Sequence, residues 1–243
     1  MSTFTPNRAH AAGRLVPAAM TAATLVFAPS LLAAQDTPAR PDAESVVEFG
    51  HAAGDSATIL SSVVPQGELK PGQTVDMILT LRQKEGGAPV AYEDLTEIHT
   101  ERIHLLIVDP SLEDYQHVHP ARTDKTGEFA FQFTPKKGGE YYFFSDLLPV
   151  KTNAQEYSLA RLTVPGEAGT VTRHDNREFI ADGYRFVLSF DDPRLVQGKS
   201  NRATLKVFGP DGRPFDRLEP LMGAFAHMVG FSEDRRHVLH VHP

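Results

Sequence analysis

One histidine-bearing motif occurs twice in the chain, and its spacing constrains how both copies can fold. Residues 104–120 read HLLIVDPSLEDYQHVHP, and residues 227–243 read HMVGFSEDRRHVLHVHP. In each copy further histidines follow the first one after 13 and 15 residues, and a proline ends the motif. Weaker matches precede both copies in the same order, so we interpret the chain as two strand-rich units in tandem.

Short β-strands are predicted throughout the chain after the N-terminal region. Apolar and polar residues alternate in short runs that Gly, Pro and Asp separate, a pattern typical of strands joined by turns. The predicted strands are residues 58–64, 74–82, 103–108, 128–133, 140–145, 157–164, 179–180, 184–190, 203–208 and 226–231. Strands of this number and spacing predict an all-β fold, either a β-sandwich or a barrel.

The two units differ in length. The first continues beyond its motif through residues 121–164, which hold three predicted strands, and the second has no counterpart to these. We therefore expect a second sheet with missing strands and an exposed edge. Either the chain is truncated or another chain covers that edge, and we favour truncation. The predicted units are a β-sandwich repeat at 45–165, a linker at 166–176 and an incomplete second repeat at 177–243.

Residues 1–34 predict a secretory signal peptide. Arg8 and Arg14 are the only charged residues there, and an apolar, Ala-rich stretch follows from Leu15. A basic start, an apolar middle and small residues at the end are typical of a cleaved export signal; an uncleaved membrane anchor is the alternative. We expect a periplasmic or secreted protein, without stable membrane insertion after cleavage, whose mature part begins with a linker at 35–44.

The composition excludes several classes of protein. The chain has no Cys, so disulfide frameworks, thiolate zinc sites, iron–sulfur clusters and blue-copper sites are excluded. It has 24 Lys and Arg against 31 Asp and Glu, a net charge of −7, and no basic run, so we expect no nucleic-acid partner. It carries no nucleophile elbow, phosphate-binding loop or HExxH motif, and we expect no enzyme activity.

The repeated histidines have the spacing of metal ligands. Residues i and i+2 of a strand point to the same face, so the last two histidines of each copy present neighbouring imidazoles. A hairpin turn after the first strand would return the chain and place the first histidine across from them. Imidazole suits Cu(II) and Zn(II), and its affinity should fall below about pH 6, because only neutral imidazole binds metal. The predicted ligands are His104, His117 and His119 in the first copy and His227, His240 and His242 in the second.

Two other interpretations of these histidines stay open. In a structural or partner-binding β-sandwich each imidazole would make a buried hydrogen bond, and duplication preserves structural residues as well as functional ones. A three-His metalloenzyme would need an open coordination position beside a cleft and a general base, for which the sequence offers no separate motif. The two histidine sets, moreover, either share one site or form two.

The two motif segments resemble a group of exported bacterial proteins, the YtkA-like or cupredoxin- and immunoglobulin-like domains linked to heavy-metal handling. The resemblance covers most of residues 70–164 and 198–243. It implies Greek-key β-sandwich repeats that bind a metal, copper first, or deliver it, and the partner in delivery would be a metal-accepting or exporting protein. The ligands it implies are the same six histidines. His-Val-His is also similar to the copper motif of Cu/Zn superoxide dismutases, but the Cys pair and the zinc-binding His cluster of that family are absent.

Overall fold

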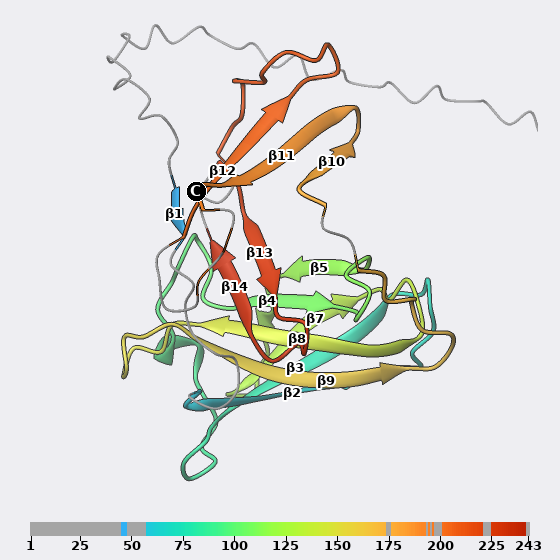
Figure 1. Cartoon of the computed structure of the whole chain (residues 1–243). Helices are drawn as coiled ribbons and strands as arrows, with labels where there is room; N and C mark the ends of the chain where they lie inside the picture. Colours follow the sequence, from blue (N-terminus) through green and yellow to red (C-terminus); the bar gives the residue numbers. More distant parts are fainter. Residues whose placement is uncertain are drawn as a thin grey trace, which may run out of the picture. The chain divides into compact units, whose positions relative to one another are not determined.

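The computed structural model describes residues 45–47, 57–173, 176–192, 194, 196, 201–220 and 225–241. These residues form β-strands joined by turns and loops, as Figure 1 shows, so the all-β prediction is confirmed. Within these ranges the one helical element is a short 3₁₀ turn, η1, at Tyr92–Asp94. In the described part of the chain we find no helix long and apolar enough to cross a membrane. The predicted signal peptide and the linker at 35–44 lie outside the described residues.

Two four-stranded antiparallel sheets form a sandwich around the main apolar core. The first sheet has the order β2-β3-β7-β6, with β2 at Ile59–Pro65, β3 at Val75–Gln83, β6 at Ala121–Arg122 and β7 at Glu128–Phe133. The second has the order β5-β4-β8-β9, with β4 at His104–Val108, β5 at Tyr115–Val118, β8 at Gly139–Leu147 and β9 at Glu156–Val164. Side chains of both sheets meet in one apolar cluster, which supports the predicted β-sandwich.

Strand β4 is buried on both of its faces, and this decides the surroundings of the predicted site. Leu105 and Ile107 belong to the main core between the sheets. Leu106 and Val108 point the opposite way, because successive residues of a strand alternate, and they belong to a second apolar cluster. His104 shares the face of Leu106 and Val108, which is the outer face of this sheet.

The remaining strands form a third sheet and a separate hairpin. The third sheet has the order β1-β12-β11-β10, with β1 at Ser45–Val47, β10 at Glu178–Ala181, β11 at Tyr184–Phe190 and β12 at Asn201–Phe208. The hairpin consists of β13 at Met228–Phe231 and β14 at Val238–Val241. All ten predicted strands overlap observed ones, whereas β1, β5, β6 and β14 were not among them. The boundaries of the tandem repeats stay a prediction.

The β13–β14 hairpin packs on the outer face of the β5-β4-β8-β9 sheet. Val238 is buried in the second apolar cluster, and Phe231 packs against it. The ring of Phe231 lies with its centroid 5.5 Å from that of Phe144. At the turn, Arg235 Nη2 donates a hydrogen bond of 2.7 Å to Pro110 O. These contacts bring the second copy of the motif against the first.

Candidate metal centre

The first-copy histidines project from one face because of the register between β4 and β5. Leu105 pairs with Val118 and Leu106 pairs with His117. The same register, continued by one residue, sets His119 across from His104. Directly opposed residues of an antiparallel pair share a face, so the three imidazoles lie together. The predicted hairpin geometry of the first copy is therefore confirmed.

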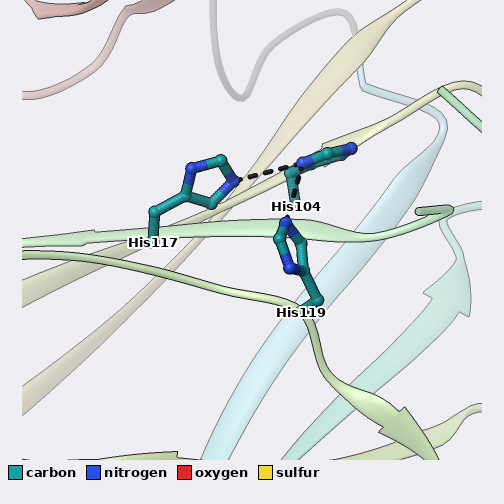
Figure 2. A group of neighbouring side chains, drawn as sticks. All are labelled: His104, His117 and His119. Atoms are coloured by element: carbon teal, nitrogen blue, oxygen red, sulfur yellow. Dashed lines mark hydrogen bonds between the residues drawn. The ribbon is translucent and has the colours of Figure 1, made fainter. Parts of the chain in front are cut away.

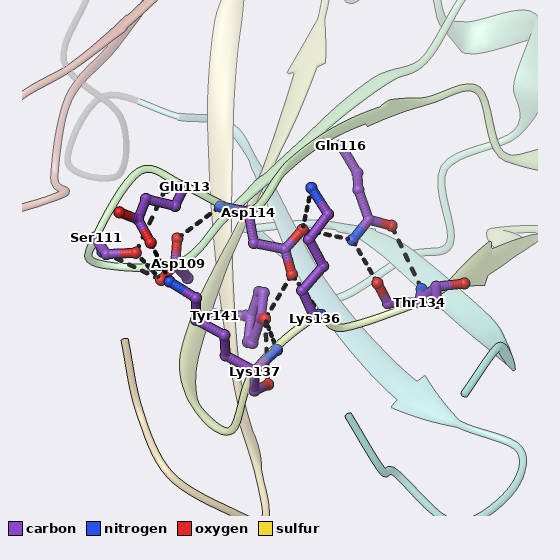
Figure 3. A network of polar contacts seen from close by, with 9 residues as sticks. All are labelled: Asp109, Ser111, Glu113, Asp114, Gln116, Thr134, Lys136, Lys137 and Tyr141. Atoms are coloured by element: carbon purple, nitrogen blue, oxygen red, sulfur yellow. Dashed lines mark hydrogen bonds and ion pairs between the residues drawn. The ribbon is translucent and has the colours of Figure 1, made fainter. Parts of the chain in front are cut away.

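A network of carboxylates holds the turn between these two strands (Figure 3). Asp109 Oδ1 accepts a hydrogen bond of 3.1 Å from Asp114 N, which closes the turn. Asp114 is fully buried, and its Oδ2 accepts hydrogen bonds from Tyr141 Oη at 2.6 Å and from Lys136 N at 2.7 Å. Burial, followed by the hydrogen bond to Asp114, raises the pKa of the Tyr141 phenol. The network ties the β4–β5 hairpin to the segment before β8 and so fixes the positions of the histidines.

The three ring nitrogens of this set converge on one point. His104 Nδ1 lies 3.1 Å from His117 Nε2 and 3.2 Å from His119 Nε2, and the three atoms lie within 4.8 Å of one another. Figure 2 shows both rings directed at the same atom of His104. These residues could hold a metal ion. We call them the histidine triad.

A backbone carbonyl fixes the tautomer of His104. Its Nε2 lies 2.9 Å from Ile98 O. A carbonyl oxygen only accepts, so Nε2 carries the proton and Nδ1 keeps its lone pair toward the other two rings. Ile98 is held by two backbone hydrogen bonds with Glu101, of 2.8 and 3.1 Å. A metal-binding histidine commonly donates its other ring N–H to such an acceptor, which fixes the orientation of the ring.

Burial keeps the triad neutral. His104 is almost fully buried, whereas His117 and His119 are partly exposed. Burial, followed by the charges of the neighbouring imidazoles, lowers the pKa of His117 to about 3. Burial also lowers the pKa of His104, against the opposing effects of the Ile98 hydrogen bond and the Asp146 charge, and lowers the pKa of His119, against Glu101. Near neutral pH the imidazoles are thus in the form that binds metal.

The spacing of the triad fits a tetrahedral ion. Zinc–nitrogen bonds of about 2.0–2.1 Å place the nitrogens of a tetrahedral site about 3.3 Å apart. The two His104 separations, 3.1 and 3.2 Å, are close to this value. The third separation, between His117 Nε2 and His119 Nε2, is no more than 4.8 Å, so the three nitrogens lie near the arrangement that a tetrahedral ion requires.

The second copy does not form a separate cluster of this kind in the part of the chain that the structure describes. There the group of three whose ligand atoms converge is the histidine triad. The ring of His240 lies beside it, with its centroid 5.3 Å from that of His117 and 5.9 Å from that of His104. The ring of His227 lies 5.9 Å from that of His240. His242 lies outside the described residues.

Two partners of the histidines were not predicted from the sequence. Ile98 O is a backbone atom in a loop, for which the sequence carries no signal. Asp146 pairs with His104 across β4 and β8, and its Oδ2 lies 2.9 Å from His240 Nδ1. The sequence does offer one indication of such a partner: Asp146 is an acidic residue inside the apolar strand YYFFSDL. A charged side chain in such a strand is buried only if it is paired.

The fold and the triad together define a β-sandwich protein with a histidine group suited to a metal ion. The chain belongs to the family described as Domain of unknown function (DUF8832), whose model matches residues 59–161 and 178–243. No curated protein matches the chain. The family description names no activity, so the function is argued from the site itself.

Proposed function

We propose that this protein is exported, binds Cu(II) or Zn(II) through His104, His117 and His119, and buffers the ion or delivers it to an accepting or exporting protein. The observation that carries the proposal is the convergence of three ring nitrogens, two of whose separations are 3.1 and 3.2 Å. Imidazole is a good ligand for both ions. The partial exposure of His117 and His119 suits a site that exchanges its ion with another molecule.

A purely structural triad is the second candidate, because His104 Nε2 does donate to a backbone carbonyl, Ile98 O. This hydrogen bond explains the position of His104 Nε2, but it does not explain why two further ring nitrogens face His104 Nδ1. His104 Nδ1 has one lone pair and can accept from only one of the two Nε2 atoms that face it. A metal ion would engage all three nitrogens together, which favours metal binding over a structural role.

Calorimetric titration of the purified chain with Cu(II) and with Zn(II) tests the proposal. The test variant is the double substitution His117→Ala/His119→Ala, and the matched control is His237→Ala, a histidine that lies exposed in the β13–β14 turn. We expect the parent and the control to bind one ion with a dissociation constant well below about 1 μM, and the double variant to lose at least about two orders of magnitude. Parent binding no tighter than micromolar, or equal binding by the double variant, would contradict metal binding at the triad.

A further inference from the structure

His240 of the second copy lies against the triad of the first. Its ring centroid is 5.3 Å from that of His117, and the rings within the triad are separated by 4.9 to 5.3 Å. The side chain of His240 is almost fully buried. A fourth imidazole therefore lies beside the triad, as close to His117 as the triad rings are to one another and slightly farther, at 5.9 Å, from His104.

A buried carboxylate orients this fourth ring. Asp146 Oδ2 accepts a hydrogen bond of 2.9 Å from His240 Nδ1, and Asp146 Oδ1 accepts one of 2.7 Å from Gln155 Nε2. With Nδ1 as the donor, a neutral His240 keeps its lone pair on Nε2. Carboxylate and carbonyl oxygens are the usual outer partners of metal-binding histidines. Asp146 thus has the same relation to His240 that Ile98 O has to His104.

The hairpin that carries His240 is held on the sheet by contacts that need no ion. Phe231 and Val238 pack against the outer face of the β5-β4-β8-β9 sheet. Arg235 hydrogen-bonds to Pro110 O in the β4–β5 turn. His240 is therefore presented to the triad by apolar packing, and loss of its imidazole leaves these contacts in place.

We propose that the metal site is composite: His240 is its fourth imidazole ligand, and Asp146 is the positioning residue that aims His240. This inference rests on the proposed function, because it concerns the same ion. Three imidazoles leave one of the four positions of a tetrahedral or square-planar ion open, and His240 is the neighbouring donor able to fill it. An ion bound in this way links the two copies of the motif.

The test counts imidazole ligands in the full chain. X-ray absorption of the Zn(II)-loaded protein and electron paramagnetic resonance of the Cu(II)-loaded protein are compared for the parent, His240→Gln, Asp146→Asn and the control His237→Gln. We expect four imidazoles in the parent and the control, three in His240→Gln, and a Cu(II) spectrum of Asp146→Asn shifted toward that of His240→Gln. The dissociation constant should rise roughly tenfold to a hundredfold in Asp146→Asn and at least as much in His240→Gln.

A second measurement uses only the parent and so does not depend on the folding of a variant. Zn(II) should slow hydrogen exchange at the amides of β13 and β14 as well as at those of β4 and β5, because the ion would link both hairpins. Protection confined to β4 and β5, or a His240→Gln variant with the parent's affinity and imidazole count, would overturn the composite site and leave the triad as the metal site. A parent chain that binds neither ion would overturn the proposed function itself.

Discussion

His104 and Asp146 face each other across strands β4 and β8, and each contacts a further histidine. His104 Nδ1 lies 3.1 Å from His117 Nε2, in its own hairpin. Asp146 Oδ2 accepts from His240 Nδ1, which lies 94 residues away in the chain. One cross-strand pair thereby connects the histidines of both copies of the motif.

Metal affinity should withstand mild acid better than the ordinary pKa of histidine implies. Three unperturbed imidazoles would lose about a thousandfold in affinity between about pH 7 and pH 5.5, because protons compete with the ion. Burial lowers the pKa of all three triad histidines, that of His117 to about 3. We expect a loss of less than about tenfold over this range, measured by titration at both pH values. We therefore expect metal binding to persist below the pH of about 6 that ordinary imidazole implies, and a thousandfold loss would show that the triad titrates like exposed histidine.

The metal-free chain should lose stability as the pH falls below 6.5. In the unfolded chain His117 takes up a proton near its ordinary pKa of 6.5, whereas in the folded chain it stays neutral down to about pH 3. The unfolded state therefore binds more protons in this window, and the free energy of unfolding falls by at most about 1.4 kcal/mol per pH unit for this residue. Urea unfolding at several pH values measures the slope. The slope should be shallower in His117→Gln, and equal slopes would contradict the assignment.

Asp114→Ala should destabilise the sandwich by about 2–4 kcal/mol, because it removes the buried carboxylate that accepts from the Tyr141 hydroxyl and the Lys136 amide. Glu113→Gln is the matched control, because Glu113 is an exposed carboxylate of the same turn whose ion pair with Lys137 lies at the surface. The control should change stability by less than about 0.5 kcal/mol. Denaturant unfolding compares the two, and similar effects would indicate that the buried network does not hold the turn.

Phe231→Ala should loosen the β13–β14 hairpin. Its ring contacts those of Phe144 and Tyr115, at centroid distances of 5.5 and 6.2 Å, and the substitution would remove about 1–3 kcal/mol of packing at this partly buried position. Hydrogen exchange of the hairpin amides should rise, and metal affinity should fall with it if His240 is a ligand. Phe179→Ala, at an exposed aromatic position on β10, is the control and should change neither the hydrogen exchange of the hairpin amides nor the metal affinity. Unchanged hydrogen exchange in Phe231→Ala would mean that the packing of the Phe231 ring does not hold the hairpin on the sheet.

Residues 1–34 should direct export and be removed. Leu25→Arg places a charge in the apolar stretch, and we expect it to leave the full-length precursor inside the cell. Intact-mass measurement of the exported protein should find a new N-terminus close to Gln35. Export of the Leu25→Arg chain at the parent's level would count against a signal peptide.

Much of the first-copy site could be predicted from local features of the sequence. The i, i+2 rule and one hairpin turn suffice to bring His104, His117 and His119 to one face, because strand geometry and short turns depend on nearby residues. The alternation of phenylalanines with Glu128, Ala130 and Gln132 likewise indicates a strand with one buried face, as observed. Strand β5, YQHV, is implied by the i, i+2 argument for His117 and His119, but its four residues carry no alternation of apolar and polar side chains that would predict its bounds.

Spacing along the chain is enough to predict the all-β fold, most of the strands and a histidine triad within one hairpin, because each depends on residues close to one another in the sequence. What surrounds that triad depends on how the chain packs in three dimensions. Ile98 O lies in an irregular loop only 6 residues from His104, and no strand or turn pattern in the sequence marks it as a partner. The Asp146–His240 hydrogen bond and the packing of the second hairpin join distant segments. Such contacts arise because the outer face of β4 is apolar and must be covered, and no local pattern in the sequence states which segment will cover it.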